Sequence, residues 1–287
     1  MKMNSRQYII SLVLMFVASL FSVSAEDNES VSVGVNTSET PSSSEASASP
    51  SSGLGYGCRL GFTIGGITPV PLPAEVREMM TFSPNGAFMQ EFFVYKLFNN
   101  KFGVYLGERL AVEGMNVEAR VKNYHMSIEQ GGDYISGYFT GVDKTEAKLI
   151  SVKIPFEFVA RVTPRLDLRV GPYAQINIHR EFKGDVYDGY LRENTPVGQK
   201  IVFSDGSTAS YDFSEDVKKG CFGAEIAADF KINRFGIFAN LDYGFGSVFP
   251  DDFETISFKM YPIFFSLGLS YRIELKRILI VGLKDKF

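Results

Sequence analysis

A histidine and a serine two residues apart, His125 and Ser127, are the pair in this sequence best suited to nucleophilic chemistry. Residues at i and i+2 of a strand share one face, so the His125 imidazole could take a proton from the Ser127 hydroxyl. Glu129, two residues further on, could orient the imidazole. A single His-x-Ser is a very weak pattern. The pair stays a hypothesis, and we assign no catalytic residue.

The other reactive residue types give no pattern typical of a metal or cofactor site. The chain has two Cys, Cys58 and Cys221, and two His, and it contains neither a CxxC pair nor an HExxH motif. His179 continues the polar face of its segment, and we expect a hydrogen-bonded histidine at the rim of the fold. We therefore predict no metal and no cofactor.

The elements that would position these residues are segments in which apolar and polar side chains alternate. Over 165–180, Leu, Val, Ala and Ile interleave with Arg, Asp, Gln, Asn and His. Strict alternation of this kind predicts a strand with two unlike faces. Such segments cover about 56–67, 86–98, 101–117, 146–161, 165–180, 218–232, 234–247 and 257–273. Most exceed the usual 5–6 residues and reach the ~9–11 of a tilted transmembrane strand.

Short and long connections alternate between these segments. Tight turns are expected at Asn99-Asn100, Thr163-Pro164 and Asn233, whereas 68–85, 118–145, 181–217 and 248–256 are longer. Up-and-down outer-membrane barrels have this asymmetry, with short periplasmic turns and long extracellular loops. Cys58 and Cys221 would then lie at opposite rims of an apolar band ~25 Å tall, which excludes a disulfide between them.

The second face of the segments distinguishes a membrane barrel from a soluble one. A lipocalin-like barrel would turn its apolar face inward and carry runs of Lys, Glu and Thr outside. Here the second face mixes glycine and small residues with isolated charges, which suits a narrow interior. A closed barrel also satisfies all backbone groups without water. We predict an all-β, eight-stranded antiparallel up-and-down transmembrane barrel.

Charged residues recur on the face expected to line the barrel interior. The interior of eight strands is only just wide enough for side chains, and an unpaired buried charge is costly, so we expect ion pairs that plug the barrel rather than a charge-selective pore. The expected residues are Arg59, Arg109, Lys153, Arg161, Arg165, Arg169, Lys231 and Arg272, with Glu113, Glu157, Asp167, Glu225, Asp229 and Asp242.

The two ends of the chain differ from the alternating region. Lys2 and Arg6 precede the apolar run IISLVLMFVASLF and then Ser-Val-Ser-Ala, which predicts a signal peptide over 1–25, cleaved after Ala25. Residues 26–55 are rich in Ser, Thr, Glu and Pro and predict a disordered tether. The barrel is expected over 56–273 and a tail or extra strand over 274–287. The formal net charge of −4 argues against a nucleic-acid partner.

Four stretches resemble the small outer-membrane β-barrels of the Bacteroidetes, the PorT-like or porin-family barrels. These are YGCRLGFTIGG, LISVKIPFEFVARV followed by LDLRVGPYAQINI, RFGIFANLDYGFG and FFSLGLSYRI, within 56–273. The resemblance implies an eight-stranded barrel, usually without an assigned activity. The 181–217 link departs from a plain loop: KIVFSDGSTASYDF predicts a hairpin above the membrane, or two more strands that would make ten.

The predicted function is that of a non-enzymatic structural or surface-interaction protein of the cell outer membrane. Its partners would be outer-membrane lipid and lipopolysaccharide, and a protein or glycan at the loops. One alternative is an accessory role in type IX-like protein secretion. Another is a lipid A hydrolase using His125 and Ser127, because lipid A deacylases have a His-x-Ser pair on a similar barrel. The loop aromatics expected at the surface are Tyr134, Tyr138, Phe139, Tyr187, Tyr190 and Tyr211.

Overall fold

The computed structural model describes residues 53–275, apart from 87, 131–132, 204–205 and 254. The expected signal peptide, the tether up to residue 52 and the tail from residue 276 lie outside this range. Within it, no helix is long and apolar enough to cross a membrane. The strands are β1 Leu54–Pro69, β2 Val76–Pro84, β3 Phe88–Leu97, β4 Phe102–Gln130, β5 Asp133–Thr163, β6 Leu166–Glu193, β7 Lys200–Phe203, β8 Ala209–Asp212, β9 Gly220–Ile232, β10 Phe235–Gly244 and β11 Met260–Leu275.

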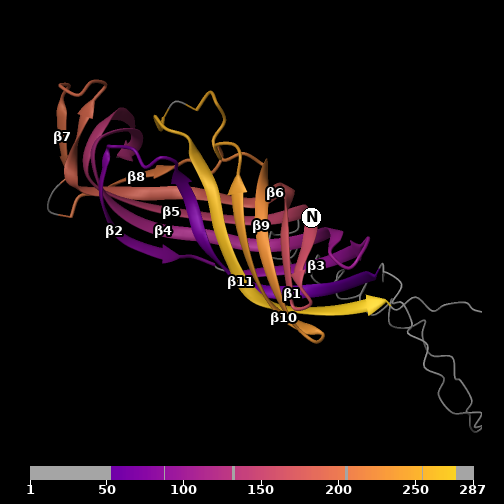
Figure 1. Ribbon diagram of the computed structural model, residues 1–287. Coiled ribbons are helices and arrows are strands. Elements are labelled where there is room, and N and C mark those ends of the chain that lie inside the picture. The colour runs from indigo at the N-terminus through magenta and orange to yellow at the C-terminus, as the bar shows by residue number, and fades with distance from the viewer. Residues whose placement is uncertain (1–52, 87, 131–132, 204–205, 254, 276–287) are drawn as a thin grey trace, which may run out of the picture. The chain divides into compact units, whose positions relative to one another are not determined.

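Eight of these strands close into a ring (Figure 1). The order around the ring is β1, β3, β4, β5, β6, β9, β10 and β11, and β11 pairs with β1 to close it. All its pairings are antiparallel. The predicted eight-stranded antiparallel barrel is confirmed, and β2, β7 and β8 lie outside the ring.

The short turns gather at one end of the ring, and side-chain caps hold two of them. The Asn99 carboxamide oxygen accepts hydrogen bonds from the backbone N–H groups of Lys101 and Phe102, at 2.8 and 2.7 Å. Thr163 accepts from the backbone of Leu166 at 3.0 Å. Asn233 adopts φ = 57°, a left-handed conformation that asparagine tolerates. The three predicted tight turns therefore lie at one end, called the short-turn end below.

The two faces of the ring differ as the alternation predicts. Large apolar side chains point outward and are exposed: Leu60, Phe62, Ile64, Leu106, Phe156, Phe158, Val170, Ile176, Phe222, Ile226, Phe230, Ile237, Leu241, Leu267 and Leu269. Inward glycines make room for rings on neighbouring strands. A Cβ on Gly57 would lie 2.6 Å from the Phe93 ring, and one on Gly223 would lie 2.4 Å from the Tyr173 ring. Small and large inward residues therefore fill the narrow interior together.

Three strands continue well past the ring at the end opposite the short turns. β4, β5 and β6 are 29, 31 and 28 residues long and run on toward β7 and β8 (Figure 1). Most of 118–145, which the sequence predicts as a loop, is therefore strand. Residues 115–130, 133–147 and 177–193 of these strands, together with β2, β7 and β8, are called the extension below.

The predicted hairpin within 181–217 is wrong in its pairing. Its arms do form strands, β7 and β8, but each pairs with β6 instead of with the other. β8 also meets β4 at Ser210–Glu129. The long β6 edge offers both short segments a complete set of backbone partners, which a four-residue hairpin cannot match. The arms belong to the extension, and the ring keeps eight strands.

Candidate functional site: a charge-filled lumen and a folded extension

The interior of the ring holds a network of buried ion pairs. Arg59 Nη1 lies 3.0 Å from Glu91 Oε1, and its Nη2 lies 2.8 Å from Asp229. Arg169 Nε lies 2.7 Å from Asp229, and its Nη1 pairs with Glu157. These side chains are 4% exposed or less. Each of these buried lumen charges therefore has a partner of opposite sign, as the cost of an unpaired charge requires.

One ion pair crosses the full width of the lumen. Arg109 on β4 and Asp242 on β10 are four strands apart in either direction around the ring, and Nη1 and Oδ2 lie 3.1 Å apart. Lys153 on β5 also reaches Asp242, at 2.7 Å, and holds Glu113 at 2.5 Å. Side chains from opposite walls thus meet at the centre, which fills the lumen at this level.

Apolar layers lie above and below these charges. Toward the short-turn end, Phe93, Tyr95, Leu97, Tyr105 and Val159 form a buried cluster. Toward the extension, a larger cluster includes side chains from β1, β4, β6, β11 and the β10–β11 connection, among them Ile67, Met115, Phe182, Phe249 and Met260. The lumen is therefore packed along its length.

Most of the predicted lumen residues are where the sequence places them. Twelve of the fourteen are buried in the network. Arg161 is half-buried and pairs with Asp167 at 3.1 Å. The prediction for Arg165 is wrong. Its side chain is exposed in the turn between β5 and β6, because β6 begins one residue later. Glu91 was missed, although it is completely buried and bound by both Arg59 and Arg109.

His179 does not continue the inward face of β6. The pairing with β5 shifts between Ile150–His179 and Ser151–Asn177, so Ile178 has no partner in the register. This bulge turns the following side chain outward, and His179 is 47% exposed with Nε2 3.7 Å from Glu181. It lies in the extension near the rim, but it is not one of the inward-facing residues.

The extension is a folded body with polar and apolar surfaces of its own. A polar pocket of about 320 Å³ lies between β4, β5, β6 and β8, and its wall carries charges of both signs. The charged residues that line it are Glu129, Lys144, Glu146, Lys183, Asp185 and Asp212. Beside it, a hydrogen bond from Lys183 lowers the pKa of the half-buried Glu181.

The aromatic residues expected in the loops divide into a buried group and a half-buried group in the extension. Phe139 and Tyr211 are buried and belong to its core, with exposures of 0% and 5%. Tyr138, Tyr187 and Tyr190 are half-buried, and the Tyr190 ring lies 4.4 Å from Lys200 Nζ. Tyr134 lies in β5, and its side chain is outside the described part. Only some of these rings are therefore available to a partner.

His125 and Ser127 share one face of β4 but have different partners. His125 Nδ1 lies 3.2 Å from the carbonyl oxygen of Thr255, and the ring contacts Tyr138 edge-on. The Ser127 hydroxyl lies 2.5 Å from that of Ser136. Glu129 is exposed. The described contacts thus bond the histidine and the serine to other residues and not to each other.

Cys58 and Cys221 are both free thiols, on β1 and β9. Among the described residues, no group of three His, Cys, Asp or Glu side chains is placed to hold a metal ion.

Comparison with known proteins finds similar solved structures and a matching family profile. Solved structures similar to this chain include the attachment invasion locus protein Ail of Yersinia pestis, at 13% identity and a TM-score of 0.30, covering 77% of this chain and 97% of Ail. A second Ail structure, in complex with the heparin analogue sucrose octasulfate, gives 12% identity, a TM-score of 0.31 and the same coverage. OprG of Pseudomonas aeruginosa gives 8% identity and a TM-score of 0.28, covering 78% of this chain and 97% of OprG. No curated protein matches in sequence.

The family profile called outer membrane protein beta-barrel domain matches residues 37–250, most of the chain. The match spans the strands from β1 to β10, and with them the ring residues that carry the lumen charges on those strands. The chain belongs to this outer-membrane β-barrel family.

Proposed function

We propose that this outer-membrane barrel is a non-enzymatic surface-interaction protein that contacts a protein or glycan partner through its extension. The ring would be surrounded by outer-membrane lipid and lipopolysaccharide. The Bacteroidetes PorT-like group remains the family subgroup that its sequence resembles.

The observation that carries the proposal is that the long connections form a folded body. The buried residues of the extension include Val121, Ile128, Phe139, Leu191 and Phe203, each 3% exposed or less. A contiguous buried cluster of this kind is the core of a folded unit. A rigid platform bearing a polar pocket suits binding, because little conformational entropy is lost when a partner docks.

The packed lumen supports an interaction role over transport. Arg109 and Asp242 meet from opposite walls, and apolar clusters lie on both sides of them. A solute would have to displace several paired charges to pass. The ring therefore acts as an anchor that holds the extension at the membrane.

The proposal also assigns an orientation. A signal peptide cleaved after Ala25 would deliver the chain across the inner membrane, and the tether would precede β1 on the periplasmic side. The short turns would then face the periplasm and the extension would face outward, as in other outer-membrane barrels.

Cysteine labelling in intact cells tests the orientation. With both native cysteines changed to serine, Val197→Cys in the exposed β6–β7 connection should react with a membrane-impermeant maleimide. Asn100→Cys in the short β3–β4 turn should react only after lysis. The opposite pattern would show that the orientation is the reverse of the one proposed. If neither cysteine were labelled in lysed cells, the ring would not be formed as described.

Binding is tested with the purified barrel in lipid nanodiscs on glycan and protein arrays. Lys144→Glu changes a charge in the polar pocket, and Lys259→Glu changes an exposed lysine before β11, away from that pocket. We expect a bound array component whose signal falls with the first change and not with the second. Equal signals from both variants would show that the partner does not contact the polar pocket.

A further inference from the structure

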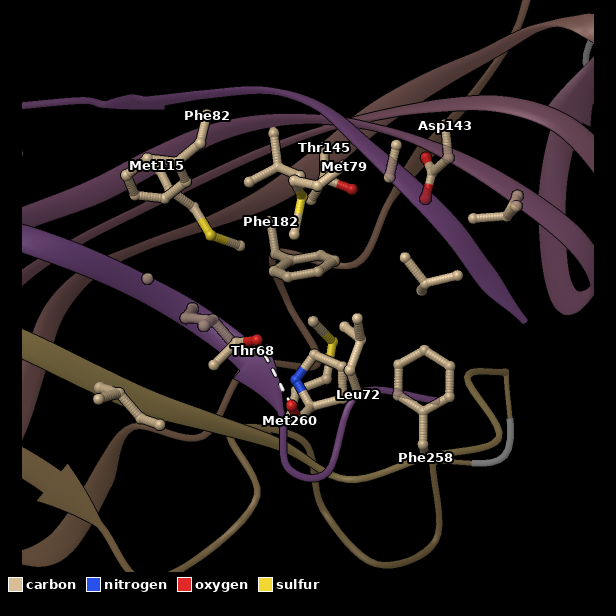
Figure 2. A pocket seen from close by; sticks show the side chains of 18 of the residues that line it. Thr68, Leu72, Met79, Phe82, Met115, Asp143, Thr145, Phe182, Phe258 and Met260 are labelled. Carbon is tan, nitrogen blue, oxygen red and sulfur yellow. Dashed lines mark hydrogen bonds between the residues drawn. The ribbon is translucent and has the colours of Figure 1, made fainter. Parts of the chain in front are cut away.

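An apolar cavity lies between the end of β1, β2 and the parts of β4 and β5 that continue past the ring (Figure 2). Its volume is about 310 Å³, at the lower end of the ~300–1,000 Å³ typical of small-molecule sites. Ile67, Met115, Val117 and Met260 contribute to its apolar wall. Gly66 keeps this space open to Met115, because a Cβ there would lie 2.3 Å from the Met115 sulfur.

The cavity is open to the outside beside β2. Leu72, Met79 and Phe82 line it and are 55%, 51% and 47% exposed. β2 pairs with β4 along one edge and forms the end of the strand order, so its other edge has no strand partner in the described part of the chain. A ligand could therefore enter without unpacking the core.

A buried carboxylate faces this apolar space. Asp143 is 8% exposed and, in Figure 2, its side chain points into the cavity. It accepts a hydrogen bond from the Tyr211 hydroxyl at 2.9 Å, and that hydroxyl lies 2.7 Å from Thr145 Oγ1. The acidic residues buried in the lumen all pair with Arg or Lys, whereas no cation of the described residues pairs with Asp143. Burial accordingly raises its pKa to about 7.

The wall around Asp143 favours a cation over an anion. Tyr124 and Phe258 stack with ring centroids 5.5 Å apart, and Phe182 also lines the cavity. Aromatic faces attract organic ammonium ions. The described lining contains no Lys or Arg, so a fatty acid or other anion would meet Asp143 without a countercharge.

We propose that this cavity binds an amphipathic organic amine, with its apolar part between β1, β2 and β4 and its ammonium group paired with Asp143. The ligand supplies the one charge that the site lacks, and its alkyl or aryl body replaces water against the apolar wall. This binding site is separate from the polar pocket and does not depend on the surface-interaction role.

Methionine NMR tests the proposal in the intact barrel in lipid nanodiscs. Met79, Met115 and Met260 line the cavity, and Met89 is buried in the lumen beside Ala111 and Phe238, so ¹³C-methyl labels give both reporters and a control. The probes are octylamine, octanol and octanoate, which share one chain length, titrated at pH 8. We expect octylamine to shift the three cavity methyls saturably, at concentrations at least tenfold below octanol and octanoate, without moving Met89.

Two isosteric variants separate the carboxylate from general effects. Asp143→Asn should raise the half-saturating octylamine concentration about tenfold or more and leave that of octanol within twofold. Asp251→Asn removes an exposed carboxylate of the β10–β11 connection that does not line the cavity, and should change neither. At pH 5 the Asp143 carboxylate carries a proton, so wild-type octylamine binding should weaken as it does in Asp143→Asn. Tyr124 and Tyr211, which face Asp143, keep their protons throughout this range and do not contribute to the change.

Equal half-saturation for the three probes would overturn the proposal, as would equal shifts at Met89 or an unchanged octylamine affinity in Asp143→Asn. A heat-dependent gel shift checks that each variant is folded. If Asp143→Asn does not fold, Ala119→Phe fills the cavity from β4 instead and should abolish saturable octylamine binding. Octylamine binding that survives a filled cavity would refute the site.

Discussion

Arg59 on β1 donates to both carboxylate oxygens of Asp229 on β9 at 2.8 Å, across 170 positions of sequence. The two strands are three places apart in the ring, so this contact can form only when the ring is closed. Arg59 also lies 4.8 Å from the ring centroids of Phe93 and Tyr105. The ion pair is thus enclosed by the barrel wall and by aromatic side chains.

Removing the Asp229 charge should destabilise the barrel strongly. Asp229→Asn leaves three guanidinium groups without a shared counterion, those of Arg59, Arg169 and Arg272. Breaking one side of a buried pair costs about 3–5 kcal/mol. Urea unfolding in lipid vesicles measures this loss. The matched change Asp251→Asn breaks an exposed pair with Lys259 and should cost no more than about 0.5 kcal/mol, and equal losses would contradict a buried network.

The ring was predictable because one physical constraint acts on every strand. Each ring strand faces lipid on one side and a narrow interior on the other, so side chains such as Val170 and Ile226 alternate with Arg169 and Glu225. Turn residues such as Asn99 then mark where each strand ends. These signals are local in sequence, and together they give the strand number and most of the charges.

Glu91 was missed because β3, although it lies in one of the alternating segments, carries large apolar side chains on both faces. Phe92 and Val94 point outward while Phe93, Tyr95 and Leu97 point inward, so the inward face of β3 does not read as a polar one. The register with β4 places Glu91 opposite Arg109, which no local pattern shows. A single carboxylate in a mostly apolar strand was the available signal.

The extension and its cavity depend on contacts between distant segments. Beyond the ring, β4 and β5 lose the regular outward row of apolar side chains, so 118–145 resembles a polar loop in sequence. The bulge at Ile178 shifts the faces by one residue and moves His179 outward. The apolar cavity brings together residues of β1, β2, β5 and β11. Only this assembly shows that the Asp143 carboxylate faces an apolar space, which the sequence around it does not indicate.

The outward apolar face should tolerate a charge far less well than an exposed loop does. Leu269→Arg places a charge on β11 where the side chain is 65% exposed, and a cationic side chain near the bilayer midplane costs about 2–4 kcal/mol. Val197→Arg, at an 86% exposed loop position, should be neutral. The fraction of folded protein after refolding into vesicles, read from the heat-dependent gel shift, measures both. A neutral Leu269→Arg would mean that this face does not contact lipid.

The packed lumen should carry almost no current. Wild-type protein in planar bilayers is expected to show no steps above the baseline. Arg109→Ala combined with Asp242→Ala removes the pair that spans the lumen, and small conductance steps should appear if these side chains close it. The control Lys259→Ala with Asp251→Ala removes an exposed pair and should stay silent. Steps of equal size in the wild type would refute a plugged barrel.

The stability of the extension should fall as pH rises from about 4 to about 7. Burial raises the pKa of Asp143 from an ordinary 3.8 to about 7, so within this range the folded protein keeps a proton that the unfolded chain has lost. The stabilisation is complete below pH 4 and lost above pH 7, a change of up to about 4 kcal/mol. Asp143→Asn cannot titrate and should remove this component, as measured by urea unfolding at several pH values. Parallel pH curves for the two proteins would show that the Asp143 carboxyl group is not held in a buried, low-dielectric site.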